Sequence, residues 1–476
     1  MNKKFIRDIS ANTMQVIIVQ LCGLVIFYLL STRLDKNDFG EINWALAVLL
    51  TAFGILSFGI DQIAIRRIAS GTNAGRLLAV YGMHVLIAGT LFYAILLIGR
   101  SVFPSFYQQH GFLLLLGIGK LMIFFSTPFK QLASGMEKFR ALLFMAICSN
   151  VLRSIALLLF AVFGQLDIKT IIIIFIAGDL AELLLCLFIT QRIIKVPVKP
   201  GWDKKEYAGL VKEALPQFGV AVFTSALSRL DWIFLGLLAS NVILAEYSFA
   251  YKVFEVATLP MLVIAPVLIP RFTKLFHPGA GEMPAAKAND LFVLLRLEMI
   301  IASLVALALN ILWVPVIDLL TQNKYGTINQ HTILILSASM PFLYLNNFLW
   351  TVNFAKGRLK MIFYVFFASF LFIVAGDIIL IPFFNAEGAA IAYLIAIIIQ
   401  SLVYLQQTKL EGLKKHSYAV LLCPALAFGC GILSTQVFDN TWLILFTALL
   451  SYLLLMVLTK QIRKTDWLVF KRITGL

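Results

Sequence analysis

Charged residues are scarce in this chain, because Asp, Glu, Lys and Arg make up only 13% of its 476 residues. Soluble globular domains carry about 25%. Hydrophobic residues make up 61% of the sequence, which leaves too few polar groups to cover a water-soluble fold. The composition therefore argues against an ordinary soluble enzyme or binding domain and favours a membrane protein.

Cysteine and histidine are also rare, with five of each. The cysteines all lie inside apolar runs and form no C-x-x-C pair, which argues against a disulfide framework or a zinc site. The histidines show no spacing typical of metal ligands. We therefore expect neither a metal nor a cofactor.

A nucleotide-binding motif is missing as well. The segment Gly117-Ile118-Gly119-Lys120 resembles the end of a phosphate-binding loop, but it lacks the earlier glycine and a following Ser or Thr. It also lies inside an apolar run, so we do not expect ATP hydrolysis. No outer loop exceeds about 20 residues, which argues against a membrane enzyme of polysaccharide assembly.

What the sequence does contain is fourteen apolar blocks of about twenty residues. A hydrocarbon core about 30 Å thick is crossed by roughly 20 helical residues, and the blocks lack the strict alternation of barrel strands. We therefore predict an all-α integral membrane protein with about 14 transmembrane helices. The expected spans are 10–32, 40–60, 77–99, 111–129, 141–163, 171–190, 216–238, 245–269, 291–313, 331–355, 361–383, 388–408, 418–436 and 441–459.

Lysine and arginine fall mainly in alternate gaps between these blocks. With a cytoplasmic N-terminus, 29 of them lie on the cytoplasmic side and 5 on the opposite side. This bias explains the net charge of +15 and predicts that both termini are cytoplasmic. The basic residues form no single patch, so we expect no nucleic-acid partner.

The first block is too long for a signal peptide and is expected to be a retained helix.

A stiff linker divides the chain into two halves. Residues 196–215 contain a Pro-rich piece and then a predicted interfacial helix capped by Asp203. The expected parts are a six-helix lobe at 1–195, a second six-helix lobe at 216–410, and two additional helices with a basic tail at 411–476. Ala133, Gly135 and Lys138 match residues 355, 357 and 360 at an offset of 222, which predicts two parallel six-helix repeats.

Ionisable residues inside the apolar blocks are the candidates for a functional site, because an unpaired charge there costs about 2.5–3.5 kcal/mol or more. Arg229 and Lys252 lie at similar depths in consecutive blocks, so they are expected to meet. Lys252 shares a helical face with Glu255, three residues later. The cations are Lys120, Arg153, Arg229, Lys252 and Arg296, and the acids are Asp179, Glu182, Asp231, Glu255, Glu298 and Asp377.

Two interpretations of these cations remain open. In the first, Lys120, Arg153, Arg229 and Lys252 line a cavity that binds an anionic substrate such as a diphosphate. In the second, each cation pairs with an acid and ties helices together; for this role the sequence offers the acids Asp179, Glu182 and Asp231. Arg296 and Glu298 lie near a membrane surface, where their side chains could reach water.

Several short motifs resemble those of the polysaccharide, or O-antigen, flippases of the multidrug/oligosaccharidyl-lipid/polysaccharide exporter superfamily. Their order and spacing agree over nearly the whole chain. They are Asp38-Phe39-Gly40, Arg66-Arg67-Ile68-Ala69, Glu213-Ala214-Leu215-Pro216, Arg229-Leu230-Asp231, and Tyr247, Ala250, Tyr251, Glu255 and Pro260.

This resemblance implies a bacterial inner-membrane flippase that moves undecaprenyl-diphosphate-linked oligosaccharide from the cytoplasmic to the outer leaflet by alternating access. Arg229, Lys252, Lys120 and Arg153 would bind the anionic head. Asp231, Glu255, Asp179 and Glu182 would balance charge or carry a coupling ion, either H+ or Na+. Membrane lipid and other polysaccharide-assembly proteins are the further partners that it implies. Two alternatives stay open: a drug or metabolite exporter of the same superfamily, and a membrane enzyme of polysaccharide assembly.

Overall fold

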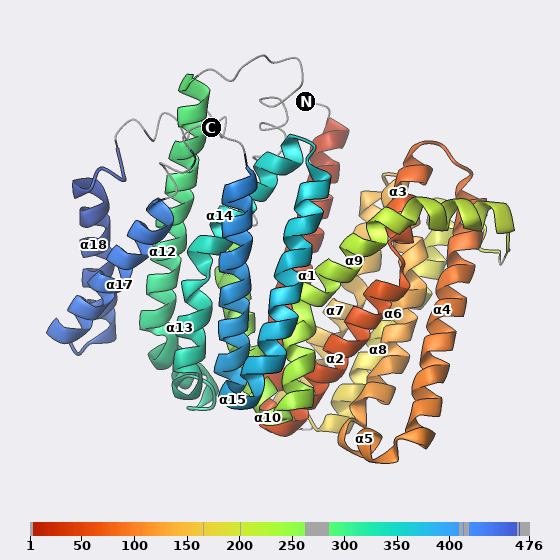
Figure 1. The fold of residues 1–476 in the computed structure, drawn as a ribbon. Coiled ribbons are helices and arrows are strands. Elements are labelled where there is room, and N and C mark those ends of the chain that lie inside the picture. Colours follow the sequence, from red (N-terminus) through yellow and green to blue (C-terminus); the bar gives the residue numbers. More distant parts are fainter. Residues whose placement is uncertain are drawn as a thin grey trace. The chain divides into compact units, whose positions relative to one another are not determined.

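The chain forms two compact units, Met1–Gly236 and Leu237–Leu476, each with its own dense set of internal contacts. Figure 1 shows the helices of the computed structural model coloured along the sequence. The structure describes residues 3–164, 166–199, 201–261, 285–408, 413, 418–463 and 466, and it describes side chains from 14 onward except at 216–217, 220–221, 224–228 and 285–289.

The first unit is a bundle of long helices in which α6 packs on α8, α4 and α2, and α7 packs on α1 and α8. Short polar side chains begin several of these helices. Asp35 accepts a hydrogen bond from the backbone of Asp38 at 2.8 Å, and Asp167 accepts one from Thr170 at 2.9 Å. The elements are α1 (Lys3–Arg33), α2 (Lys36–Leu56), α3 (Ile60–Ala69), α4 (Ala74–Val102), α5 (Pro104–Gln109), α6 (Phe112–Gly135), α7 (Phe139–Val162), α8 (Ile168–Phe188), η1 (Ile189–Ile194) and α9 (Lys204–Leu238).

Helix α9 runs without a break from the linker into the segment predicted as the seventh span. Asp203 precedes it and accepts hydrogen bonds from the backbone N–H groups of Lys205 and Glu206, as expected of a cap. The predicted interfacial helix and the seventh span are therefore one helix, and the boundary between the two compact units falls near its end, after Gly236.

The second unit is built around α12, which packs on α13, α14, α17 and α18. The part of the predicted span 245–269 that follows residue 261, and most of the basic tail, lie outside the described residues. The elements are α10 (Asn241–Ala257), α12 (Ala285–Thr321), η2 (Thr327–Asn329), α13 (Gln330–Ala338), α14 (Met340–Ala355), α15 (Leu359–Gln407), α17 (Ala419–Val437) and α18 (Thr441–Leu458).

Helix α15 is a hairpin of two helices. Its 49 residues would extend over about 70 Å at 1.5 Å per residue, far more than one membrane crossing. Asn385 breaks the helical backbone with φ 50° and ψ −125°. A Cβ at Gly388 would lie only 2.4 Å from the Leu380 carbonyl oxygen, so the two arms touch directly after the turn. The hairpin matches the two predicted spans 361–383 and 388–408.

The surface of the described helices suits a hydrocarbon environment. Large apolar side chains are extensively exposed, such as Leu319 at 81%, Val162 at 80% and Phe383 at 77%. Eleven helical segments of the described residues are long and apolar enough to cross a membrane. Each of the fourteen predicted spans lies largely in helix over its described part, with short turns such as residues 57–59 within the second span. The predicted all-helical, multi-span membrane fold is confirmed.

The two repeats share a helix ending, although not at the predicted offset. After α6, Glu137 takes φ 55° and the Lys138 N–H bonds the Ala133 carbonyl at 2.8 Å. After α14, Gly357 takes φ 69° and the Arg358 N–H bonds the Asn353 carbonyl at 3.0 Å. These are the same left-handed caps, and residue 137 corresponds to 357. The offset of 222 is therefore wrong by two residues, because it aligned Gly135 with the cap glycine.

Candidate functional site

A buried ion cluster joins three helices of the first unit. Lys120 of α6, Arg153 of α7 and Asp179 of α8 are 8%, 6% and 1% exposed. The Lys120 Nζ lies 3.2 Å from one carboxylate oxygen of Asp179, and the Arg153 guanidinium forms an ion pair with the other oxygen. One acid therefore pairs with two cations that come from different helices.

A second acid extends this cluster. Glu182 is one turn beyond Asp179 on α8 and accepts a 2.7 Å bond from the Lys130 Nζ and a bond from the Ser149 hydroxyl. The cluster thus contains three cations and two acids and keeps a net positive charge. A net positive charge on helices that cross the membrane favours binding of an anionic partner.

Two glycines and one aromatic ring shape the cluster. A Cβ at Gly119 would lie 2.6 Å from an Asp179 oxygen, and a Cβ at Gly178 would lie 2.9 Å from the Arg153 Cγ. The glycines therefore let the ions approach closely, which explains a glycine next to Lys120 without any phosphate loop. The Phe175 ring lies 4.7 Å from the Arg153 guanidinium carbon, a distance typical of cation–π contact.

The structure thus brings Lys120 and Arg153 to Asp179, as the pairing interpretation expects. Substrate binding by these two cations stays a prediction. Sequence reasoning missed Lys130, which directly follows the predicted span 111–129, and Ser149. One signal could have found the second pair: Asp179 and Glu182 are three residues apart on a helix and therefore share a face.

Arg229 and Asp231 lie near the end of α9 in the first unit. The Arg229 guanidinium carbon is 4.5 Å from the Trp232 ring, within cation–π range. Asp231 is buried, and one of its oxygens accepts the Trp232 N–H at 2.9 Å. Substrate binding by Arg229 and charge balance by Asp231 stay predictions.

Lys252 and Glu255 lie on α10 in the second unit. The Lys252 Nζ is 2.8 Å from a Glu255 oxygen, so the predicted shared face is confirmed. Their side chains are 17% and 38% exposed, which leaves both groups partly accessible. Because Arg229 belongs to the other unit, the predicted meeting of Arg229 and Lys252 stays a prediction.

The two charges predicted near a surface on α12 do not behave as expected. Arg296 forms a 2.7 Å ion pair with Asp466, 170 residues later in the chain, and is 13% exposed at its side chain. Glu298 is 3% exposed. Arg296 is therefore held in an ion pair with little exposure and Glu298 is buried, in a helix on which α14, α17 and α18 pack.

Polar uncharged residues of α14 connect it to α15. Asn346 donates to the Gln400 side chain at 3.1 Å and accepts a 2.8 Å bond from Ser401, and Asn353 donates to Thr408 at 2.7 Å. These bonds join helices, which is a common role of Asn and Ser inside a membrane. In the same unit, an apolar cavity of about 530 Å³ lies between α12, α13 and α17, and it is lined in part by Asn310, Leu334 and Phe428.

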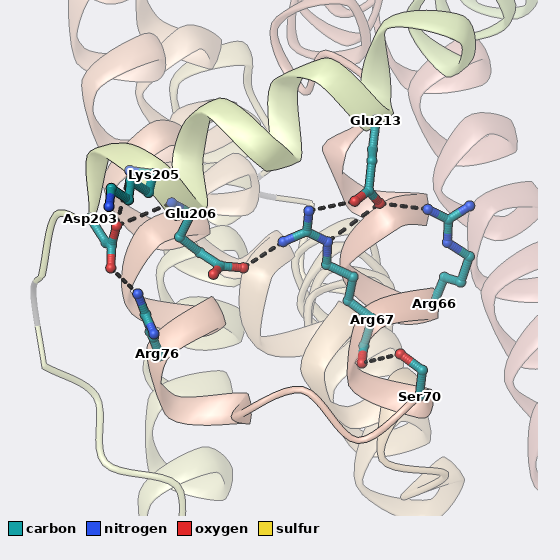
Figure 2. A network of polar contacts seen from close by, with 8 residues as sticks. All are labelled: Arg66, Arg67, Ser70, Arg76, Asp203, Lys205, Glu206 and Glu213. Carbon is teal, nitrogen blue, oxygen red and sulfur yellow. Dashed lines mark hydrogen bonds and ion pairs between the residues drawn. The ribbon is translucent and has the colours of Figure 1, made fainter.

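A network of ion pairs fixes the beginning of α9 to α3 and α4 (Figure 2). Glu213 bonds Arg66 at 2.5 Å and Arg67 at 2.6 Å, and Arg67 also bonds Glu206 at 2.5 Å. Arg76 forms an ion pair with Asp203. Two motifs that carried the family resemblance, one after the second predicted span and one before the seventh, are therefore partners in space.

Two acids of this network, Glu213 and Asp203, have pKa values below their ordinary values. The side-chain bond from Arg67 holds the pKa of Glu213 below its ordinary value. The backbone N–H of Glu206, followed by the Arg76 side chain, holds the pKa of Asp203 below its ordinary value. The contact is therefore fully formed above the ordinary carboxyl pKa and is lost as the pH falls through the lowered values.

We expect Glu213→Gln to loosen the start of α9, because it removes the charge that both arginines bind. Exposed pairs contribute at most about 1 kcal/mol, so backbone protection over residues 203–213 should fall about fivefold. Hydrogen exchange measured by mass spectrometry on the full chain checks this result. Wild type should lose the same protection as the pH falls below the ordinary carboxyl range and through the lowered pKa values of Glu213 and Asp203. Glu137→Gln, an exposed acid in another loop, is the control, and unchanged exchange in Glu213→Gln would contradict the assignment.

Comparison with known proteins identifies the class. The chain belongs to the polysaccharide biosynthesis protein family, whose pattern it matches over residues 5–276. No curated protein matches it significantly.

Solved structures share its fold. The lipid II flippase MurJ in an inward closed conformation is similar with a TM-score of 0.72 at 17% identity, covering 94% of this chain and 98% of MurJ. An inward-facing multidrug resistance MATE transporter of the MOP superfamily has a TM-score of 0.65 at 13% identity, with 87% and 98% covered. A MOP superfamily transporter from Pyrococcus furiosus has 0.58 at 13% identity, with 88% and 96% covered. The chain therefore has the fold of these flippases and exporters.

Proposed function

We propose that this protein is a secondary-active flippase that moves undecaprenyl-diphosphate-linked oligosaccharide from the cytoplasmic to the outer leaflet of a bacterial inner membrane. The observation that carries the proposal is the surplus of positive charge in the buried cluster of three cations and two acids. A diphosphate has the charge and the acceptor oxygens that Lys and Arg bind best. Membership of the polysaccharide biosynthesis family supports the choice of a lipid-linked sugar.

In this mechanism the diphosphate and sugar occupy a polar path through the protein while the isoprenoid tail stays in the bilayer. Arg229 and Lys252 bind the diphosphate, Arg229 by a planar fork and Lys252 as a point charge. Lys120 and Arg153 provide a second cationic position, at which Asp179 limits the affinity and so permits release. The apolar cavity beside α12 gives the tail a matching surface. Both termini are cytoplasmic in this account, as the distribution of Lys and Arg predicts.

We assign to the acids the role of balancing the positive charge of these cations during transport. Asp179 and Glu182 offset two of the three positive charges of the first cluster when no substrate is bound, and Glu255 pairs with Lys252. Asp231 is a further candidate for the site of the coupling ion. Transport against a gradient requires such an ion, either H+ or Na+, because no nucleotide motif supplies energy.

Deletion of the gene in its natural host tests the proposal. Lipid-linked oligosaccharide is expected to accumulate on the inner leaflet, because synthesis continues while transfer stops. Mass spectrometry of the accumulated lipid would also identify the sugar. Unchanged lipid-linked sugars, with normal surface polysaccharide, would refute the proposal.

A second function is export of drugs or metabolites, which the similarity to a multidrug resistance MATE transporter favours. An exporter of cationic drugs would be expected to place acids in its cavity, whereas the cluster of the first unit has a positive surplus. Increased drug resistance of an expressing strain, with unchanged lipid-linked sugars in the deletion strain, would establish this second function.

A further inference from the structure

Glu298 is a buried acid for which the transport mechanism gives no role. It lies on α12 eight residues after Asp290, about 12 Å along the helix from the start of the apolar run Asp290–Thr321. The residue is 3% exposed, and neither carboxylate oxygen has a hydrogen-bond partner among the residues that the structure describes. Burying an unpartnered carboxylate at such a position costs free energy, so we expect this side chain to bind a ligand that removes its charge.

The nearest charges are engaged elsewhere. Arg296 is two residues earlier on the same helix, which directs it to another face, and it is bound by Asp466 at 2.7 Å. Tyr344 of α14 interacts electrostatically with Glu298. Titratable groups on the packed helices have other partners: Tyr452 of α18 bonds the Ile300 carbonyl, Cys423 and Cys430 of α17 interact with Tyr452, and His331 of α13 pairs with Glu387.

The ligand that fits this environment is a proton. A hard metal cation takes about six or more oxygen ligands, whereas Glu298 offers one carboxyl group with a single tyrosine nearby. No group of three or more His, Cys, Asp or Glu in the described part of the chain is arranged to hold a metal ion. A protonated carboxyl group is neutral, and it can stay buried at far lower cost than the anion.

We propose that Glu298 is a proton-carrying site, neutral when buried as here and ionised when the transport cycle opens it to water. A group that is neutral in one state and charged in the other binds its proton differently in the two states, which couples proton movement to the conformational change. The proton site itself stands on the burial of Glu298, and its role in transport rests on the proposed flippase function. The coupling ion would then be H+ and not Na+.

Infrared difference spectroscopy of the purified full chain in lipid tests the proton site without any substrate. Wild type should show the carbonyl band of a protonated, buried carboxyl group that disappears as the pH is raised. Glu298→Gln should lack this band, whereas Glu387→Gln, which changes a half-exposed acid in the same unit, should keep it. Identical difference spectra for wild type and Glu298→Gln would overturn the proposal.

Transport in liposomes tests the coupling. On the limiting side of its titration, the wild-type rate should change about tenfold per pH unit, and Glu298→Gln should lose this dependence. A variant with unchanged pH dependence would refute the coupling.

If wild type moves no lipid-linked sugar, the flippase proposal fails while the infrared result still decides the proton site. If Glu298→Gln does not fold, Tyr344→Phe replaces it: a shifted titration of the same band supports the site, and an unshifted titration contradicts it.

Discussion

Replacing Asp179 with Ala is expected to prevent accumulation of stably folded protein. The change removes the acid that Lys120 and Arg153 share and leaves both cations buried without their counter-charge. Breaking a buried ion pair in this way costs about 3–5 kcal/mol, a large part of the typical stability of a folded domain. The measurement is the yield and the thermal midpoint of unfolding of the detergent-purified protein, followed by size-exclusion chromatography.

Two further variants make the Asp179 result specific. Asp439→Ala removes an exposed acid between α17 and α18 and should behave as wild type. The triple change Asp179→Leu, Lys120→Met and Arg153→Met removes all three charges and should recover much of the lost stability, because no charge of the trio is left unpaired. If Asp179→Ala is as stable as Asp439→Ala, Asp179 does not neutralise the two cations.

The double change Arg229→Ala and Lys252→Ala is expected to give the largest loss of transport. Each residue is assigned a charge-assisted bond to the diphosphate, worth about 1.5–3 kcal/mol. Each single change should therefore lower transport about 10- to 100-fold in proteoliposomes at limiting substrate. Arg229→Lys should give an intermediate rate, because it keeps the charge but loses the planar fork.

Controls separate substrate binding from loss of a structural pair. Lys252→Ala leaves Glu255 without its 2.8 Å partner, so Lys252→Ala with Glu255→Ala is the matched variant. Arg100→Ala removes an exposed cation at the end of α4 and should transport normally. Normal transport by the Arg229 and Lys252 variants would refute their assigned role, even if the protein proves to be a flippase.

Local sequence patterns were sufficient to predict the fold. Each apolar run is long enough to cross a bilayer, and a helix satisfies its own backbone, so the spans could be located without knowledge of their neighbours. Even the hairpin in α15 could be predicted, because an apolar stretch of 49 residues is long enough to cross the bilayer twice. The residue-level alignment of the repeats could not be predicted. Gly357 is a cap glycine, and the sequence alignment placed Gly135 opposite it, although the corresponding cap residue is Glu137.

The site could be predicted only in part, because ion pairs between helices depend on which faces meet. The sequence identified Lys120, Arg153, Asp179 and Glu182 as unusual, but not the sharing of Asp179 by two cations. Partners far apart in the chain were missed altogether, such as Arg296 with Asp466. The two motifs that contain Arg67 and Glu213 were recognised separately, and only the fold shows that they bind each other (Figure 2).

The most direct test of the central claim uses the purified protein in liposomes that contain undecaprenyl-diphosphate-linked oligosaccharide in the inner leaflet. Appearance of the sugar in the outer leaflet is followed by a lectin or a glycosidase that cannot enter the vesicle. We expect protein-dependent transfer that is inhibited by excess soluble diphosphate and is unaffected by cationic drugs. Transfer no faster than in protein-free vesicles, or equal transfer of a neutral lipid-linked sugar, would contradict the role of the membrane-embedded cations.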